Sequence, residues 1–168
     1  DDISYIGAVT LTGAPAINTA AGAGTVRFSA TVDGGQNLTI TAGTGNIDFD
    51  GIVGGTTDLA AISIVSAGNT TADAAISAAS LAQTAGTATT LSGLVTTSGV
   101  VTMAATNFVL PAAGDITAGD AVSLTGTIST AGDVTTTNDA VSYIGAVTLA
   151  GATAINTGGG LGTVRFSA

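Results

Sequence analysis

Residues 1–30 of this chain recur almost unchanged as residues 139–168. Without a gap, 23 of 30 positions are identical between DDISYIGAVTLTGAPAINTAAGAGTVRFSA and DAVSYIGAVTLAGATAINTGGGLGTVRFSA. Self-similarity at a long, fixed period is typical of solenoids and tandem arrays. We therefore interpret residues 1–138 as one complete solenoid repeat unit and residues 139–168 as the start of the next unit.

Short alternations of apolar and small polar residues run through both units. Each alternation places two apolar side chains on one face of an extended segment, which is the pattern of a half-buried strand. Turn signals rich in Gly, Asn and Asp lie between them, and this even spacing predicts an all-β protein. We expect ten apolar residues of these alternations to point into the core: Val26, Phe28, Leu38, Ile40, Ile47, Phe49, Ile62, Ile64, Val122 and Leu124.

The shortage of aromatic residues favours a solenoid over a β-sandwich. The chain has four Phe, two Tyr and no Trp, whereas bulky aromatics commonly fill the gap between the sheets of an immunoglobulin-type sandwich. A parallel β-helix needs only a narrow core, in which Val, Ile, Leu, Ala and Thr stack on themselves in coils of about 20 residues. We expect a parallel β-helix with strands of about three to five residues and turns of Gly, Asn and Asp. One 138-residue unit then holds roughly six or seven coils, about 30 Å of axial rise.

One segment is ambiguous. The Ala-rich stretch Thr71–Gln83 has the composition of a short helix capped by Asp73. As strands, it would point Ile76 and Leu81 inward from two successive faces. The surrounding pattern favours strand or turn.

The polar chemistry of the chain is unusually sparse. There is no Cys, His, Trp, Lys or Glu, the eleven acids are all Asp, and the net charge is −9. Such a composition offers almost nothing for acid–base catalysis, so we do not expect an enzyme. The acidic charge argues against nucleic acid and anionic membranes as partners. No apolar run approaches the roughly 20 residues of a membrane-spanning helix, so membrane insertion is not expected.

The best local candidate for a binding site is Asn46-Ile47-Asp48-Phe49-Asp50-Gly51. Alternate oxygen-bearing side chains at Asn46, Asp48 and Asp50, followed by a glycine, resemble the start of a calcium loop. The Glu that would close such a loop is missing, and Thr57 stands in its place. The alternative is that Ile47 and Phe49 face inward and the three polar side chains simply face solvent. Calcium is the one cofactor that the sequence suggests.

The two cations, Arg27 and Arg165, occupy the same place in the two copies. Each lies between inward-facing apolar neighbours, so its side chain should point outward. We expect either an ion pair with an Asp of an adjacent coil or chain, or a lone charge that keeps an exposed strand soluble. The recurrence favours a structural role.

The amino-acid sequence of the repeat resembles repeats of very large secreted bacterial proteins. The segment NDAVSYIGAVTLAGATAINTGGGLGTVRFSA, together with LSGLVTTSGVVTMAATNFVL and ITAGDAVSLTGTI, is similar to the β-strand repeats of exoproteins and adhesins of the filamentous-haemagglutinin type. The resemblance covers essentially the whole chain. It implies a right-handed parallel β-helix, secretion, and a location on or outside the cell. It supplies no catalytic residues.

These features together favour a structural role. We expect a repeat segment of a long secreted surface fibre, sheath or adhesin stalk, with copies of itself or adjacent repeats as end-to-end partners. The alternative is a ligand-binding adhesin module, directed at carbohydrate or assisted by calcium. Since neither end shows a polar cap, further coils should continue the solenoid. The two near-identical segments should share one conformation, related by a translation along the axis plus some rotation.

Overall fold

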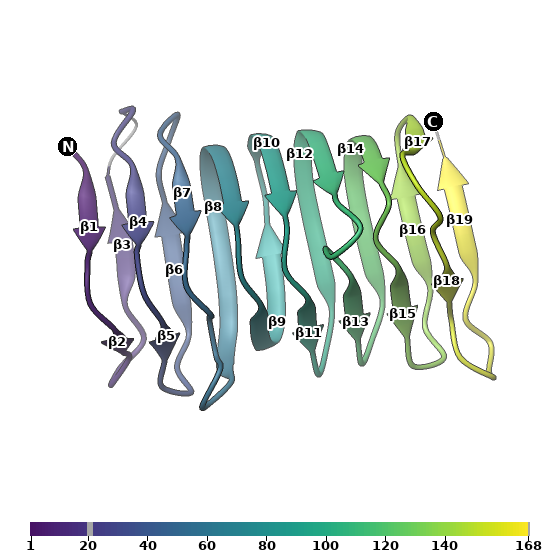
Figure 1. Cartoon of the computed structure of the whole chain (residues 1–168), viewed down its shortest axis with the longest axis horizontal. Helices are drawn as coiled ribbons and strands as arrows, with labels where there is room; N and C mark the ends of the chain where they lie inside the picture. Colours follow the sequence, from purple (N-terminus) through teal and green to yellow (C-terminus); the bar gives the residue numbers. More distant parts are fainter. Residues whose placement is uncertain (20–21, 168) are drawn as a thin grey trace.

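The chain is wound into a parallel β-solenoid of about eight coils (Figure 1). The structure is a computed structural model that describes residues 1–19 and 22–167. The described residues form strands, turns and bends and contain no helix. The strands pair in parallel between successive coils, as predicted.

Each coil contributes one strand segment to each of three ladders, which we call faces A, B and C. Face A contains β1 (Ile3–Tyr5), β4 (Val26–Phe28), β7 (Ile47–Phe49), the end of β8 (Leu59–Ala72), β10 (Gly86–Leu91), the ends of β12 (Val101–Leu110) and β14 (Val122–Thr130), and β17 (Val147–Leu149). Face B contains β2 (Val9–Thr10), β5 (Val32–Asp33), a bridge at Val53, the start of β9 (Ile76–Gln83), β11 (Val95–Thr97), β13 (Ile116–Ala118), β15 (Val134–Thr136) and β18 (Ile155–Asn156). Face C contains β3 (Ala16–Asn18), β6 (Leu38–Thr41), the start of β8, the end of β9, the starts of β12 and β14, β16 (Val141–Ile144) and β19 (Val164–Ser167).

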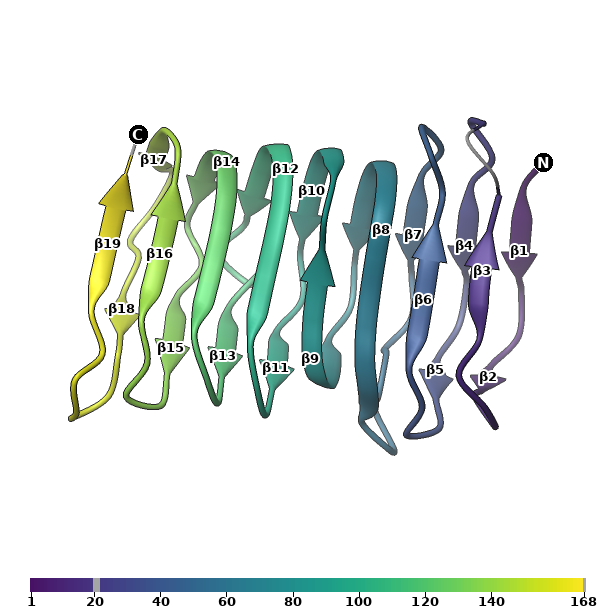
Figure 2. The same ribbon diagram turned by 180° about the vertical axis from the view of Figure 1, so that it is seen from behind.

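The coil is right-handed. In Figure 1 the chain descends along the near side through β1, β4 and β7 and ascends along the far side through β3 and β6, while it advances from the N-terminus on the left to the C-terminus on the right. Figure 2 shows the ascending strands from behind.

The core consists of like side chains stacked from coil to coil. All ten residues that the alternation predicts to point inward are at most 1% exposed. One inward column on face B contains only Val and Ile, and a second column on the same strands contains Ala and Thr. The first is Val9, Val32, Val53, Ile76, Val95, Ile116, Val134 and Ile155, and the second is Ala78, Thr97, Ala118 and Thr136. β-Branched side chains suit such a stack because they are stiff and pack well on a pleated surface.

Four strands are much longer than the expected three to five residues. One of them, β9 with 8 residues, passes from face B to face C, and the other three pass from face C to face A. β8 has 14 residues, β12 has 10 and β14 has 9. Each passes from face C to face A without leaving the extended conformation, because the corner is made by a small residue or a bulge. In β14 the corner is Gly126, where φ is +136° and a side chain would collide with the Ala105 carbonyl of the preceding coil. The expectation of uniformly short strands is therefore wrong at this corner.

The ambiguous stretch Thr71–Gln83 is strand. β8 ends at Ala72 and β9 begins at Ile76, with a bend between them. Ile76 is buried on face B and Leu81 on face C, as the strand interpretation requires.

The two copies of the repeated segment form equivalent strands, but on different faces. β1, β2, β3 and β4 correspond in sequence to β16, β17, β18 and β19. The register is the same, since Ile3 pairs with Val26 and Val141 pairs with Val164. However, β1 and β4 lie on face A, whereas β16 and β19 lie on face C. Counted along the ladders, the copies are six whole coils and two of three faces apart.

Candidate functional site

The three candidate calcium ligands lie along one side of β7. Ile47 and Phe49 are buried in the core, so Asn46, Asp48 and Asp50 alternate with them on the outer side, half-buried. Neighbouring members are about 6.6 Å apart along an extended strand, whereas calcium ligands must converge to within about 2.6 Å of one point. The strand thus presents a row of oxygens rather than a loop that encloses an ion.

Two members of the row already have partners. The Asn46 side-chain oxygen accepts a hydrogen bond from the backbone N–H of Asn69 at 3.1 Å. Asp50 Oδ2 accepts a hydrogen bond from Arg27 Nε at 2.8 Å, and Arg27 Nη2 lies 2.6 Å from the same oxygen. In the described ranges no group of three or more acidic side chains is placed to hold a metal ion. Calcium binding here stays a prediction.

Asp48 is the remaining member and has a perturbed environment. Partial burial raises its pKa, and the negative charge of Asp50 adds to this, while Arg27 acts in the opposite direction. Asp48 therefore carries its charge at some cost, and a cation or a proton would relieve that cost.

Of the two alternatives for the arginines, Arg27 shows the outward ion pair with an Asp of the adjacent coil. It points out from face A and reaches Asp50 on the next coil. Arg165 is the same residue of the repeat, but β19 is the last strand of face C among the described residues. Among the described residues, no following coil supplies an Asp next to Arg165.

Sequence reasoning missed a second role for the Asp and Asn side chains. Several of them accept a hydrogen bond from a backbone N–H of the next coil: Asp2 from Thr25 at 2.7 Å, Asp33 from Thr56 at 2.8 Å, Asn37 from Ala61 at 3.1 Å, Asp115 from Asp133 at 2.8 Å and Asp133 from Ala154 at 2.7 Å. These bonds satisfy amide groups at corners where the ladder is interrupted. The signal in the sequence was the recurrence of Asp or Asn beside turns at about one coil length.

Buried polar side chains were missed as well. Gln83 is 2% exposed within the face C stack, where its amide nitrogen donates to Thr89 Oγ1 at 2.7 Å and to the Ala104 carbonyl at 3.2 Å. Thr97 and Thr130 point inward and donate to the carbonyls of Gly99 and Gly132. These buried side chains form hydrogen bonds inside the solenoid near its corners and do not contact solvent.

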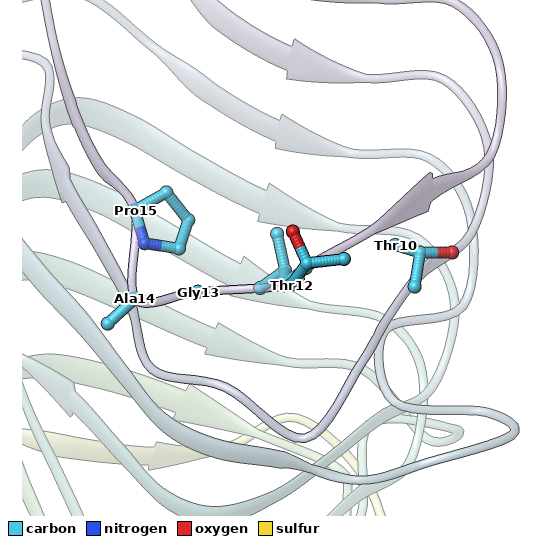
Figure 3. Close-up of a pocket in the computed structure, with 6 residues that line it drawn as sticks. Thr10, Thr12, Gly13, Ala14 and Pro15 are labelled. Atoms are coloured by element: carbon cyan, nitrogen blue, oxygen red, sulfur yellow. The ribbon is translucent and has the colours of Figure 1, made fainter.

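Two open hollows on the surface are lined by small, apolar and Thr side chains. One of about 400 Å³ is lined by Thr10, Leu11, Thr12, Gly13, Ala14 and Pro15, all from the first coil (Figure 3). Another of about 270 Å³ is lined by Ala85, Gly86, Ala104, Ala105, Thr106 and Thr125, at the bulge of β12. Neither lining includes a titratable side chain, so neither offers a general acid or base.

The most distinctive surface is the end of the solenoid beyond β19. Phe166 is 57% exposed and Val164 is 43% exposed, whereas the same residues of the first copy, Phe28 and Val26, are at most 1% exposed. Leu149 and Leu161 are also exposed at this end. Among the described residues no further coil packs on these side chains.

Comparison with known protein families, curated proteins and solved structures found no match to this chain. The fold defines its class as a right-handed parallel β-solenoid. The described part of the chain contains no helix that is long and apolar enough to cross a membrane.

Proposed function

We propose that this chain is a structural, non-catalytic segment of a long extracellular fibre, sheath or adhesin stalk. The observation that carries the proposal is the passage from one repeat unit into the next. β16, β17 and β18 of the second unit pair with β14 and β15 of the first without a break in any ladder. A solenoid that continues through its own unit boundary can be extended indefinitely by adding units.

The absence of a catalytic role is supported by the chemistry of the side chains. The chain has no Cys, His, Lys or Glu, which removes the commonest nucleophiles and general bases. The Ser77 hydroxyl donates to Asp58 Oδ1 at 2.7 Å, but no imidazole or amine stands beside this exposed pair. Four of the eleven acids, Asp2, Asp33, Asp115 and Asp133, accept hydrogen bonds from backbone amides of the next coil. Location outside the cell rests on the resemblance of the repeats to those of secreted exoproteins and adhesins.

Electron microscopy of chains with one, two and four consecutive 138-residue units tests the fibre role. At about 4.8 Å per coil, each unit should add about 32 Å to the length of a rod of constant width. Compact particles, or a length that does not grow with the number of units, would contradict the proposal.

Incubation of the same proteins with extracellular polysaccharides tests the absence of catalysis. We expect no release of reducing ends above that of buffer. Reproducible turnover that disappears when a particular Asp is changed to Asn would overturn this part of the proposal.

A further inference from the structure

The exposed end beyond β19 has a counterpart inside the molecule, where the same residues are covered. β17, β18 and β19 correspond to β2, β3 and β4 of the first copy. In the first copy these strands carry the next coil, in which β5 pairs with β2, β6 with β3 and β7 with β4. The molecule therefore shows which sequence fits on the exposed end, namely residues 32–50.

The contacts of this internal coil are specific. Phe49 stacks on Phe28 with ring centroids 5.3 Å apart and an angle of 5° between the rings. Asp50 pairs with Arg27. At the exposed end, Phe166 is stacked on Tyr143 on one side only, at 5.2 Å. Both partners that the first copy uses, an aromatic ring and a carboxylate, are missing above Phe166 and Arg165 in the described residues.

The opposite end of the solenoid has a matching counterpart. The hollow formed by Thr10–Pro15 corresponds to residues 148–153 of the second copy. In that copy the segment rests on the preceding coil: the Ala150 N–H donates to the Thr130 carbonyl at 2.8 Å, and the Ala154 N–H donates to Asp133 Oδ1 at 2.7 Å. Residues of the type of Thr130–Asp133 therefore fit the open hollow.

The face change between the copies determines how such units follow one another. The 138-residue offset spans six coils and two of three faces, so a unit does not end where it began around the axis. A unit with a whole number of coils would have returned β16 to face A. Three units, or 414 residues, are needed to complete a whole number of coils, which is 20.

We propose that a second unit of this same sequence continues on the exposed end through its residues 32–50, and that consecutive units turn by one third of a turn about the fibre axis. This inference rests on the proposed fibre function and specifies its geometry. The structural period of the fibre is then three units, about 96 Å at about 4.8 Å per coil. Outward features such as the Arg27–Asp50 pair appear on each of the three sides in succession.

The fit of the second unit can be tested on the full chain. Residues identical to 31–58 are appended after residue 168, and hydrogen exchange is measured at the amides of β19. We expect exchange there to slow by about tenfold or more, since edge amides gain partners and Phe166 becomes covered. The matched control carries Phe49→Asp in the appended copy only, and β19 should then exchange as fast as in the natural chain. Equal exchange rates with and without the natural extension would overturn the proposed fit.

The rotation is tested separately by fibre diffraction or cryo-electron microscopy on chains of six units. An axial repeat of about 96 Å with a strong spacing near 32 Å supports the one-third turn. A repeat of about 32 Å alone would overturn the rotation while leaving the fibre function intact. Chains that form no rod at all would overturn both.

Discussion

Tyr5 and Tyr143 are the same residue of the repeat, and their surroundings differ only because of the neighbouring coils. Tyr143 is fully buried between coils, and its hydroxyl has no hydrogen-bond partner. Tyr5 is half-buried, because no coil precedes it among the described residues. The burial of a side chain at this position of the repeat therefore depends on the coils that stack on it.

Changing Tyr143→Phe should stabilise the fold and remove a sensitivity to alkali. Burial raises the pKa of Tyr143 from 10 to about 12. Between these values the unfolded chain loses its proton first, so the natural protein should lose stability as pH rises from 10 to 12. The unpartnered hydroxyl also has a desolvation cost, and its removal should add about 1 kcal/mol at neutral pH. Urea unfolding from pH 7 to 12 measures both effects.

Tyr5→Phe is the matched control, because it removes the same hydroxyl from the other copy. It should leave the alkaline loss of stability in place. If Tyr143→Phe shows the same alkaline loss as the natural protein, the hydroxyl is not buried in solution.

Changing Asp48→Asn should raise the melting temperature slightly at pH 7. The pKa of Asp48 is raised, so its charged form is disfavoured in the folded state, and the amide removes that charge. The gain should fade as pH falls through the raised pKa, because the natural side chain is then protonated as well. Solvent screening keeps the effect below about 1 kcal/mol. Asp120→Asn, on an exposed turn, removes one charge elsewhere and should show no such gain.

The same two proteins test calcium binding at Asn46, Asp48 and Asp50. Millimolar calcium that raises the melting temperature of the natural protein and not that of Asp48→Asn would support the site. Equal responses of the two proteins would argue against it.

At the level of elements, stability comes from stacks that run across successive strands. Tyr5, Phe28 and Phe49 stack on β1, β4 and β7 with centroid distances of 4.9 and 5.3 Å. Tyr143 and Phe166 on β16 and β19 form the same kind of stack with one layer fewer. Contacts with the neighbouring strands of the ladder stabilise each strand, even where the strand itself is only three residues long.

Phe28→Ala should therefore be far more damaging than Phe166→Ala, although the two residues are copies. Phe28 is enclosed on both sides, and its truncation should cost about 3–5 kcal/mol. Phe166 is 57% exposed, and its truncation should cost about 1 kcal/mol or less. Urea unfolding of the two variants compares them directly. Similar losses in both would show that the end coil is covered in solution.

For the whole molecule, the solenoid topology makes each coil depend only on the coils beside it. Hydrogen exchange should consequently be graded along the axis. The amides of β1 and β19 should exchange fastest, and those of β8, β9 and β12 in the middle should exchange slowest. Mass spectrometry of peptides from the full chain measures this gradient. Uniform protection from end to end would indicate that the ends are covered by self-association.

Much of the fold follows from local patterns that the sequence contains by itself. The alternation of apolar and polar residues determines which side chains enter the core, since successive residues of a strand point to opposite sides. The scarcity of aromatics selects a narrow core, and the coil length of about 20 residues is the one general to parallel β-helices. The inward residues from Val26 to Leu124, the parallel pairing and the six or seven coils per unit could all be predicted on these grounds.

Only the tertiary structure decided which parts of the chain meet. Coil lengths vary, from 24 residues between Leu38 and Ile62 to 18 between Ile116 and Val134, and their sum determines that the second copy falls on face C. The choice of Asp50 as the partner of Arg27, and the capping of amides by Asp33 and Asp133, depend on the same accumulated register. Local patterns act over a few residues, whereas the face on which a distant segment falls depends on the lengths of all the coils before it.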